Sequence, residues 1–249
     1  MDISNRTIKN KAYRVFRDNI GTAILAMLLV AGINLAGHYL ASALFAGTDI
    51  LNLILYQVFL FILSLITAVF SAGQAVLYLH MAREQESSIQ DLLYFFRNHP
   101  DRVIVAAFVL SLISLVVNIP ADVYGYTAVV GTTMESQLQY LMTSYIVQMA
   151  CQIVYILITL PFSMTWYLLS EDPGRGGSAA LKESMKMMRG VKKQYLLLLI
   201  SFIPGLVLSV IALYIPLLFV IPHMNLSKAG FYDALREQLS QSSPESKLE

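Results

Sequence analysis

The sequence predicts an all-α fold, a polytopic bundle of transmembrane helices, on three observations. Hydrophobic residues make up 57% of the 249-residue chain, charged residues make up only 13%, and five long stretches contain no Asp, Glu, Lys or Arg. A soluble domain is about 25% charged. In hydrocarbon the backbone must satisfy its own hydrogen bonds, so an apolar stretch of about 20 residues becomes a helix. The five stretches are Gly21–Thr48, Ile50–Ala82, Val103–Ala121, Ser136–Ser170 and Gln194–Ser227.

The charged segments between these stretches predict their orientation. Lys and Arg gather in residues 1–20, 83–102 and 171–193, whereas the other two connections carry only acidic charges. By the positive-inside rule the basic segments face the cytoplasm. We therefore expect one membrane domain over residues 1–249, with a cytoplasmic N-terminus. Its expected parts are an amphipathic segment (1–20), spans 1 and 2 (21–82), an interfacial helix (83–102), spans 3 and 4 (103–170) with an outer loop (122–140), a second interfacial helix (171–193), a last apolar stretch (194–227) and a tail (228–249).

Each basic segment repeats one pattern: a short amphipathic helix, a polar turn and then a span. The apolar faces end at Phe16, Phe96 and Met188, and an arginine follows directly in each copy. Three copies of an interfacial helix plus a span pair need six spans. Residues 194–227 would then be a hairpin broken near their prolines. The alternative is one kinked span there, and five spans in total.

Helices of this kind lie in the membrane interface, with the basic face toward lipid head groups. The basic residues on one stripe of the third helix are Lys182, Lys186, Arg189 and Lys193. This stripe suits anionic lipid, although basic flanks can also serve only to set topology. Two end signals bound the helices: Ser88 and Asp91 have capping-box spacing, and Gly190 suits a helix C-terminus.

Among the uncharged polar or titratable side chains within or at the ends of the charge-free stretches, seven are candidates for a polar cavity. They are Asn34, His38, Gln57, Gln74, Asn118, Gln148 and Gln152. If they converge, they form a polar cavity for a lipid head group or a peptide. The favoured reading is interhelical hydrogen bonding, worth about 0.6 kcal/mol per bond. Pro161 is expected to kink the fourth span, and the backbone groups freed there need another partner.

The C-terminal third carries a string of short motifs. In order these are Ser-Glu-Asp-Pro (170–173), Ala-Leu-Lys-Glu-Ser (180–184), Met-Arg-Gly (188–190), Leu-Ile-Ser-Phe-Ile (199–203), Ile-Pro (221–222) and Phe-Tyr (231–232). The string resembles the bacterial integral-membrane family catalogued as domain of unknown function 975. The positions that match the family's motifs are Asp172, Pro173, Ser184, Gly190, Ser201, Phe202, Pro222, Phe231 and Tyr232.

The resemblance implies a fold and a location, the bacterial cell (inner) membrane, but no established activity. The chain departs from the family pattern at three places. Pro204–Gly205 replaces a Gly-Trp pair, His223 replaces the Tyr of Pro-Tyr, and residues 211–214 lack the glycine of the family's last turn. The missing glycine puts the turn of the final hairpin, and so the hairpin itself, in question.

No catalytic, phosphate-binding or metal-binding signature accompanies these spans, and Cys151 is the only cysteine. We therefore expect no cofactor and no nucleic-acid partner, and favour a non-enzymatic scaffold or accessory subunit of a membrane complex. Its expected partners are membrane lipids, anionic ones among them, and another membrane protein or a second copy. The alternative is a transporter or lipid-handling protein built around the uncharged polar cavity. A lipid-directed membrane enzyme is the least favoured reading, for want of a nucleophile beside a base or an acid pair.

Overall fold

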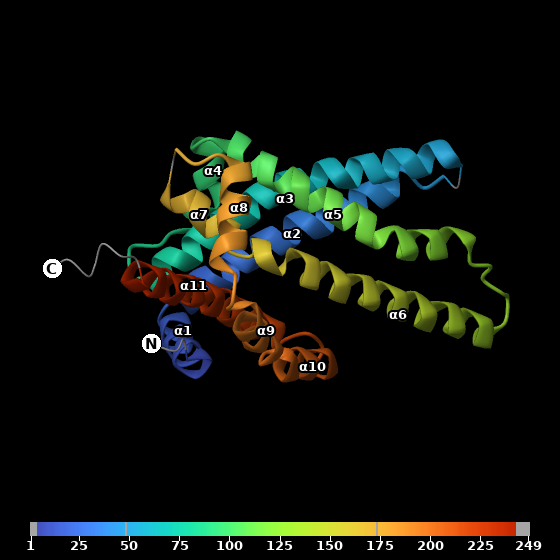
Figure 1. The fold of residues 1–249 in the computed structure, drawn as a ribbon. Helices are drawn as coiled ribbons and strands as arrows, with labels where there is room; N and C mark the ends of the chain where they lie inside the picture. Colours follow the sequence, from blue (N-terminus) through green and yellow to red (C-terminus); the bar gives the residue numbers. More distant parts are fainter. Residues whose placement is uncertain (1–3, 48, 173, 243–249) are drawn as a thin grey trace.

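The computed structural model of the chain describes residues 4–47, 49–172 and 174–242 (Figure 1). All secondary-structure elements in these ranges are helices, which confirms the predicted all-α bundle. The α-helices are α1 (Asn5–Asp18), α2 (Ile20–Leu44), α3 (Ile50–Ala82), α4 (Tyr94–Arg97), α5 (Pro100–Thr127), α6 (Met134–Thr159), α7 (Thr165–Glu171), α8 (Gly177–Met187), α9 (Lys192–Ile200), α10 (Ile203–Ile211) and α11 (Leu217–Ser242). Two 3-10 helices, η1 (Ile89–Leu93) and η2 (Leu160–Phe162), precede α4 and follow α6.

Five helical segments are long and apolar enough to cross a membrane, as expected of a multi-pass membrane protein. They are Ile20–Leu44, Ile50–Ala82, Pro100–Thr127, Met134–Glu171 and Lys192–Ile211. The first four follow the charge-free stretches closely. The main difference lies in the expected outer loop, residues 122–140. Because α5 runs on to Thr127 and α6 already begins at Met134, only residues 128–133 connect them.

The last apolar stretch is a broken hairpin. The chain reverses direction between α10 and α11, and Figure 1 shows α11 returning to the end of the molecule where α1 lies. Leu213 and Tyr214 take positive φ angles of 52° and 64° in this turn. The turn therefore forms without glycine, at a cost of about 1–2 kcal/mol per residue. The returning helix α11 is not among the five candidate spans, because polar residues such as His223, Asn225 and Lys228 interrupt its apolar stretch.

The three amphipathic segments correspond to α1, to η1 with α4, and to α8. Each of them packs on neighbouring helices: α1 packs on α11, η1 on α3, and α8 on α5 and α7. Phe16, Leu92 and Leu181, one from each segment, are buried. Part of each apolar face is therefore covered by protein, whereas Tyr13, Leu93, Phe96 and Met185 stay exposed, so their placement in the membrane interface stays a prediction. The capping box at Ser88 and Asp91 is present as predicted.

The buried core lies at one end of the bundle. The helices α1, α4, α7 and α8 and the C-terminal part of α11 lie at this end (Figure 1), which we call the charged end. In α3 the buried residues begin only at Thr67 and continue to Ala82, and in α6 Cys151 alone is buried. The far halves of the long helices expose apolar side chains instead, as expected of surfaces that face lipid. The charged end is therefore where the packing positions side chains.

Candidate functional site

A cluster of paired charges ties three helices together at the charged end. We call it the Arg83 cluster; its members are Arg83, Glu171, Tyr232, Asp233 and Arg236. Arg83 donates to Oδ1 of Asp233 from Nε (3.0 Å) and from Nη2 (2.6 Å), and Nη2 also donates to Oε1 of Glu171. Arg236 donates to the same Glu171 oxygen, and the Tyr232 hydroxyl donates to Oε2. One carboxylate thus accepts from two arginines and a tyrosine.

Local structure brings these side chains together. Arg83 directly follows α3, and Glu171 is the last residue of α7. Tyr232 and Arg236 lie four residues apart on α11, so they share a helix face and reach the same carboxylate. The Tyr232 ring stacks on Tyr167 of α7, with 5.0 Å between the ring centroids. This stacking holds the hydroxyl beside Glu171.

The charged groups of the cluster are partly removed from water, and its two arginines balance the charge of its two carboxylates. The Glu171 side chain is only 14% exposed. Burial alone would lower the pKa of Arg83, but the hydrogen bonds to Asp233 and Glu171 outweigh burial and raise the pKa. Burial raises the pKa of Asp233, and Arg83 offsets this only in part. For Tyr232, burial and the bond to Glu171 both raise the pKa. Removing one partner of such a set strands a buried charge, which costs about 3–5 kcal/mol.

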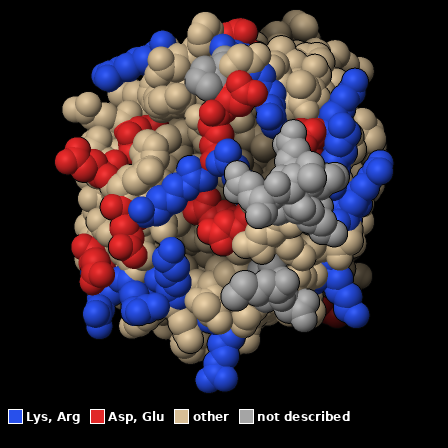
Figure 2. All heavy atoms as spheres, turned by 60° about the vertical axis from the view of Figure 1, so that its left-hand side comes forward, with Lys and Arg blue, Asp and Glu red and all other residues tan. Residues whose placement is uncertain are grey.

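The face that carries this cluster is rich in charges of both signs. Figure 2, turned so that the left-hand side of Figure 1 comes forward, shows basic and acidic side chains interspersed across it.

The sequence reasoning did not find the cluster. A usable signal was present, because Arg83 and Glu171 are the first charged residues after two charge-free stretches. Spans that end at the same level bring their end residues together, but their pairing depends on the packing of α11.

Ser184 occupies the predicted kink at Pro161. Its hydroxyl donates to the carbonyl oxygen of Pro161 (2.8 Å) and accepts from the backbone N–H of Met164 (3.1 Å). Ser184 is fully buried. One side chain of α8 therefore satisfies two backbone groups at the break between α6 and α7, which is the partner that the kink requires.

Ser201 and Phe202 form the break between α9 and α10 and anchor α1. Lys9 donates from Nζ to the Ser201 hydroxyl (3.0 Å) and carbonyl (3.2 Å). The same ammonium lies 4.4 Å from the centre of the Phe202 ring, a cation–π geometry. His223 of α11 approaches both partners, with its ring edge-on to Phe202 and its Nε2 3.0 Å from the Lys9 carbonyl oxygen. These contacts join α1, α11 and the break.

The remaining motif positions lie in turns and in the core. Asp172 accepts from the backbone N–H of Gly174 (2.9 Å) and closes the turn after α7. Gly190 has a φ of 86°, as predicted for a residue that follows a helix C-terminus. Pro222 and Phe231 are buried in α11. Pro173 lies outside the described residues. The motif positions that the structure describes thus lie in turns, in helix breaks, in the Arg83 cluster or in the core.

The structure joins only two of the seven polar residues of the stretches to each other by a side-chain hydrogen bond within the described ranges. Gln148 donates to Oδ1 of Asn118 across α5 and α6 (3.1 Å). Asn34 donates to the carbonyl of Val30 in its own helix. The other residues are half-buried, as for Gln57 and Gln74, or exposed, as for His38 and Gln152. They lie on different helices, and Gln57 of α3 also hydrogen-bonds the side chain of Asp122 on α5. For the remaining residues both readings, interhelical hydrogen bonding and a polar cavity, stay predictions.

The basic stripe of α8 and the start of α9 is exposed. Its residues are Lys182, Lys186, Arg189 and Lys193. Of these, Lys186 lies 3.7 Å from Glu183, an exposed pair that contributes little. Within the described ranges no group of three or more His, Cys, Asp or Glu side chains is arranged to hold a metal ion. Because the four basic side chains of the stripe are exposed, their charge is available to a lipid or protein surface.

Comparison with known proteins gives one match. A family model described as a protein of unknown function (DUF975) matches residues 1–239. No curated protein and no solved structure matches the chain. The match extends from α1 almost to the end of α11, so it includes the Arg83 cluster, the Ser184 kink and the Lys9 anchor.

Proposed function

This chain belongs to the DUF975 family of proteins of unknown function, and from its geometry we propose that it is a non-enzymatic scaffold or accessory subunit of a membrane complex. One observation carries the proposal: polar side chains stay exposed on the surfaces of candidate spans. Gln152 lies near the middle of the span Met134–Glu171 and is exposed, as is His38 on α2. A polar group that faces hydrocarbon without a hydrogen bond is unfavourable, so a partner helix would stabilise it.

The packing of α6 supports the same reading. This helix contacts α5 along its length and η2 at its end, and Cys151 is its one buried residue in the described chain. Beyond Glu135 its other side chains are apolar, glutamines, or hydroxyl-bearing (Ser, Thr and Tyr). Such a helix has faces available for another membrane protein or a second copy.

The Arg83 cluster supports a structural rather than a catalytic role. A general acid or base needs a proton-transfer face open to substrate. Here Glu171 accepts three hydrogen bonds from the cluster itself, and Asp233 accepts two. We therefore assign the cluster to fixing α3, α7 and α11 relative to one another. A transporter built on the seven polar residues is not proposed, because they do not gather around one cavity.

We further propose that the charged end faces the cytoplasm of a bacterial cell membrane, from the basic segments at that end. The test replaces Cys151 by Ser and introduces Ser240→Cys on α11. A membrane-impermeant thiol reagent should label this cysteine only after the cells are opened. Labelling in intact cells would contradict the orientation.

Site-specific photocrosslinking tests the scaffold proposal. A photoreactive residue at position 152 of α6 should give one discrete protein adduct in intact membranes. The matched control is position 62 of α3, where Ile62 is also exposed in a span; it should give lipid adducts. Gln152→Leu should release the same partner during purification in mild detergent while the melting temperature stays unchanged, because leucine suits a lipid-facing position.

Two results would contradict the proposal. One is lipid adducts alone at position 152. The other is an unchanged set of co-purifying proteins in the Gln152→Leu variant.

A further inference from the structure

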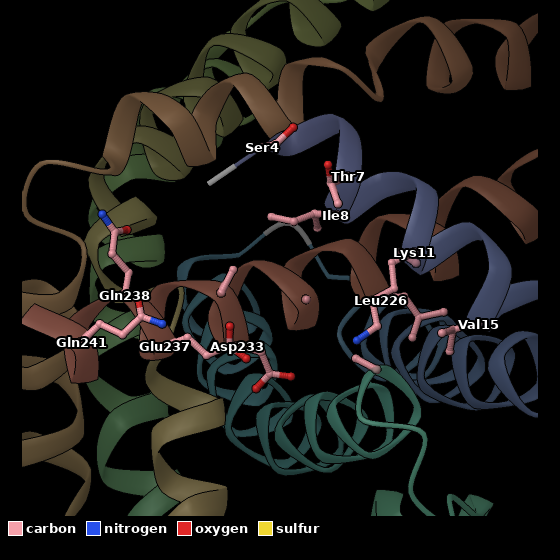
Figure 3. A pocket seen from close by; sticks show the side chains of 14 residues that line it. Ser4, Thr7, Ile8, Lys11, Val15, Leu226, Asp233, Glu237, Gln238 and Gln241 are labelled. Atoms are coloured by element: carbon pink, nitrogen blue, oxygen red, sulfur yellow. The ribbon is translucent and has the colours of Figure 1, made fainter. Parts of the chain in front are cut away.

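Two adjoining cavities of different character lie along α1 at the charged end. The first is a groove of about 340 Å³ between α1 and α11, over the end of α3 (Figure 3). Small and apolar side chains form much of its lining: Ile8, Ala12, Ala82, Leu226, Gly230 and Ala234. Its rim is polar, with Lys11 from α1 and Asp233 and Glu237 from α11. Two helices that face each other through alanine and glycine leave space that larger side chains would fill.

The second cavity, of about 430 Å³, lies beyond the C-terminal half of α1 and has a polar lining. Lys11 and Arg14 contribute positive charge to it, and Asp18 and Glu84 contribute negative charge. Lys11 and Val15 line both cavities. An apolar groove and a polar cavity of mixed charge therefore meet at Lys11.

The position of the cavities relative to the spans indicates their depth. Ala82, in the lining of the groove, is the last residue of the candidate span α3. Asn19, in the lining of the polar cavity, directly precedes the candidate span α2. Residues at the ends of membrane spans lie at the level of the lipid head groups. Both cavities are therefore placed where a phospholipid presents its polar and apolar parts together.

We infer that these cavities bind one phospholipid with a zwitterionic, amine-bearing head group of the phosphoethanolamine type. The phosphate lies between Lys11 and Arg14, and the ammonium lies beside Asp18 and Glu84. Part of an acyl chain occupies the groove against Ala234. This site is separate from the exposed basic stripe of α8 and does not depend on the scaffold proposal.

The mixed charge selects this head group over others. A purely anionic head group would meet the carboxylates of Asp18 and Glu84 as well as the two cations. A purely cationic one would meet Lys11 and Arg14. A zwitterion places a charge of the right sign against each pair. Asp18 also lies 3.8 Å from Arg17, but both side chains are exposed, so this contact is too weak to hold Asp18 away from a ligand.

The test uses the purified full chain in a non-ionic detergent, and native mass spectrometry measures lipid binding. The probes are lysophosphatidylethanolamine, lysophosphatidylglycerol and free phosphoethanolamine. We expect saturable one-to-one binding of lysophosphatidylethanolamine and weaker binding of the other two. Lys11→Gln removes a charged partner of the phosphate and should weaken binding about tenfold.

Two further variants test the apolar groove and the polar cavity separately. Ala234→Leu fills the groove and should also weaken binding of lysophosphatidylethanolamine. Glu84→Gln should abolish the preference for this lipid over lysophosphatidylglycerol. The matched control is Arg6→Gln, an exposed residue of α1 that lines neither cavity; its binding should equal that of the unmodified chain. Melting temperatures show whether each variant is folded, and Lys11→Gln alters only a residue on the cavity rim.

Each contrary result overturns a defined part of the inference. Equal affinity in Lys11→Gln, Ala234→Leu and Arg6→Gln would place the lipid elsewhere. Equal or tighter binding of lysophosphatidylglycerol would exclude the zwitterionic preference. Free phosphoethanolamine that binds as tightly as the single-chain lipid would show that the groove holds no acyl chain. Loss of the protein partner at position 152 would leave all of these results unchanged.

Discussion

Replacing Ser184 by alanine removes only one hydroxyl group, but it should destabilise the protein more than the loss of so small a group suggests. The hydroxyl of this fully buried residue bonds the carbonyl oxygen of Pro161 and the N–H of Met164. Alanine removes both partners without moving α8 away, so two backbone groups lose their hydrogen bonds inside the core. The matched control is Ser170→Ala, whose hydroxyl donates only to the carbonyl of Tyr167 in its own helix.

The expected cost follows from the two groups left unsatisfied. Each buried, unpaired backbone group costs about 1–3 kcal/mol, and relaxation of the kink recovers part of this, so we expect about 2–4 kcal/mol for Ser184→Ala. For a chain of this length such a loss lowers the melting temperature by roughly 5–15 °C. The free energy of unfolding of Ser170→Ala should fall by about 0.5 kcal/mol or less, because the carbonyl of Tyr167 keeps its place in the helix.

Unfolding of both variants in mixed detergent micelles, followed by circular dichroism, measures the difference. If Ser184→Ala unfolds at the same point as Ser170→Ala, then the hydroxyl does not satisfy the kink and the argument from buried backbone groups is wrong. A lower helix content in Ser184→Ala before unfolding would instead indicate that the kink itself has rearranged.

Three further predictions use the same measurement. Gly177→Ala should cost about 1–3 kcal/mol, because a Cβ there would lie 2.2 Å from a backbone oxygen of α5, whereas Gly176→Ala, which meets open space, should be neutral. Leu213→Gly should stabilise the final hairpin by about 1 kcal/mol, because glycine adopts the positive φ of this turn without strain. Burial lowers the pKa of Lys228 from 10.5 to about 8. The uncharged amine is favoured in the folded state, so stability should fall as the pH drops from 10.5 to about 8 and level off below that, and Lys228→Met should remove this dependence.

Each of these predictions has its own contrary result. Equal melting temperatures for the two glycine variants would mean that α8 does not approach α5 as closely as described. A destabilised Leu213→Gly variant would mean that the leucine side chain contributes more than the backbone strain costs. An unchanged pH dependence in Lys228→Met would assign that dependence to other groups, and Lys182→Met, at an exposed position, serves as the control.

Local sequence signals predicted the local features of the fold correctly. The charge-free stretches located the long helices, and the proline at position 161 located the kink between α6 and α7. The capping-box spacing at Ser88 and the glycine at position 190 located helix ends. Each of these features depends on hydrogen bonds within a few residues, or on the absence of charge over one helix length, so the sequence alone contains the cause.

Other features depend on contacts between distant segments. The turn at Leu213 forms without glycine because the packing of α11 against α1 and α3 can offset the strain of two residues. The apolar faces of α1 and α8 could have faced lipid or protein with the same sequence pattern. Which surface covers an amphipathic helix is decided by what lies next to it, and periodicity does not contain that information.

By itself the sequence determined that this chain is helical, that five of its helical segments are long and apolar enough to cross a membrane, and where its charged segments lie. These follow from the cost of placing charge and unpaired backbone in hydrocarbon. Only the tertiary structure decided that Arg83 meets Glu171 and Asp233, and that Lys11 joins an apolar groove to a polar cavity. Arg83 and Asp233 are 150 positions apart, and they meet because α11 folds back along α1 and α3.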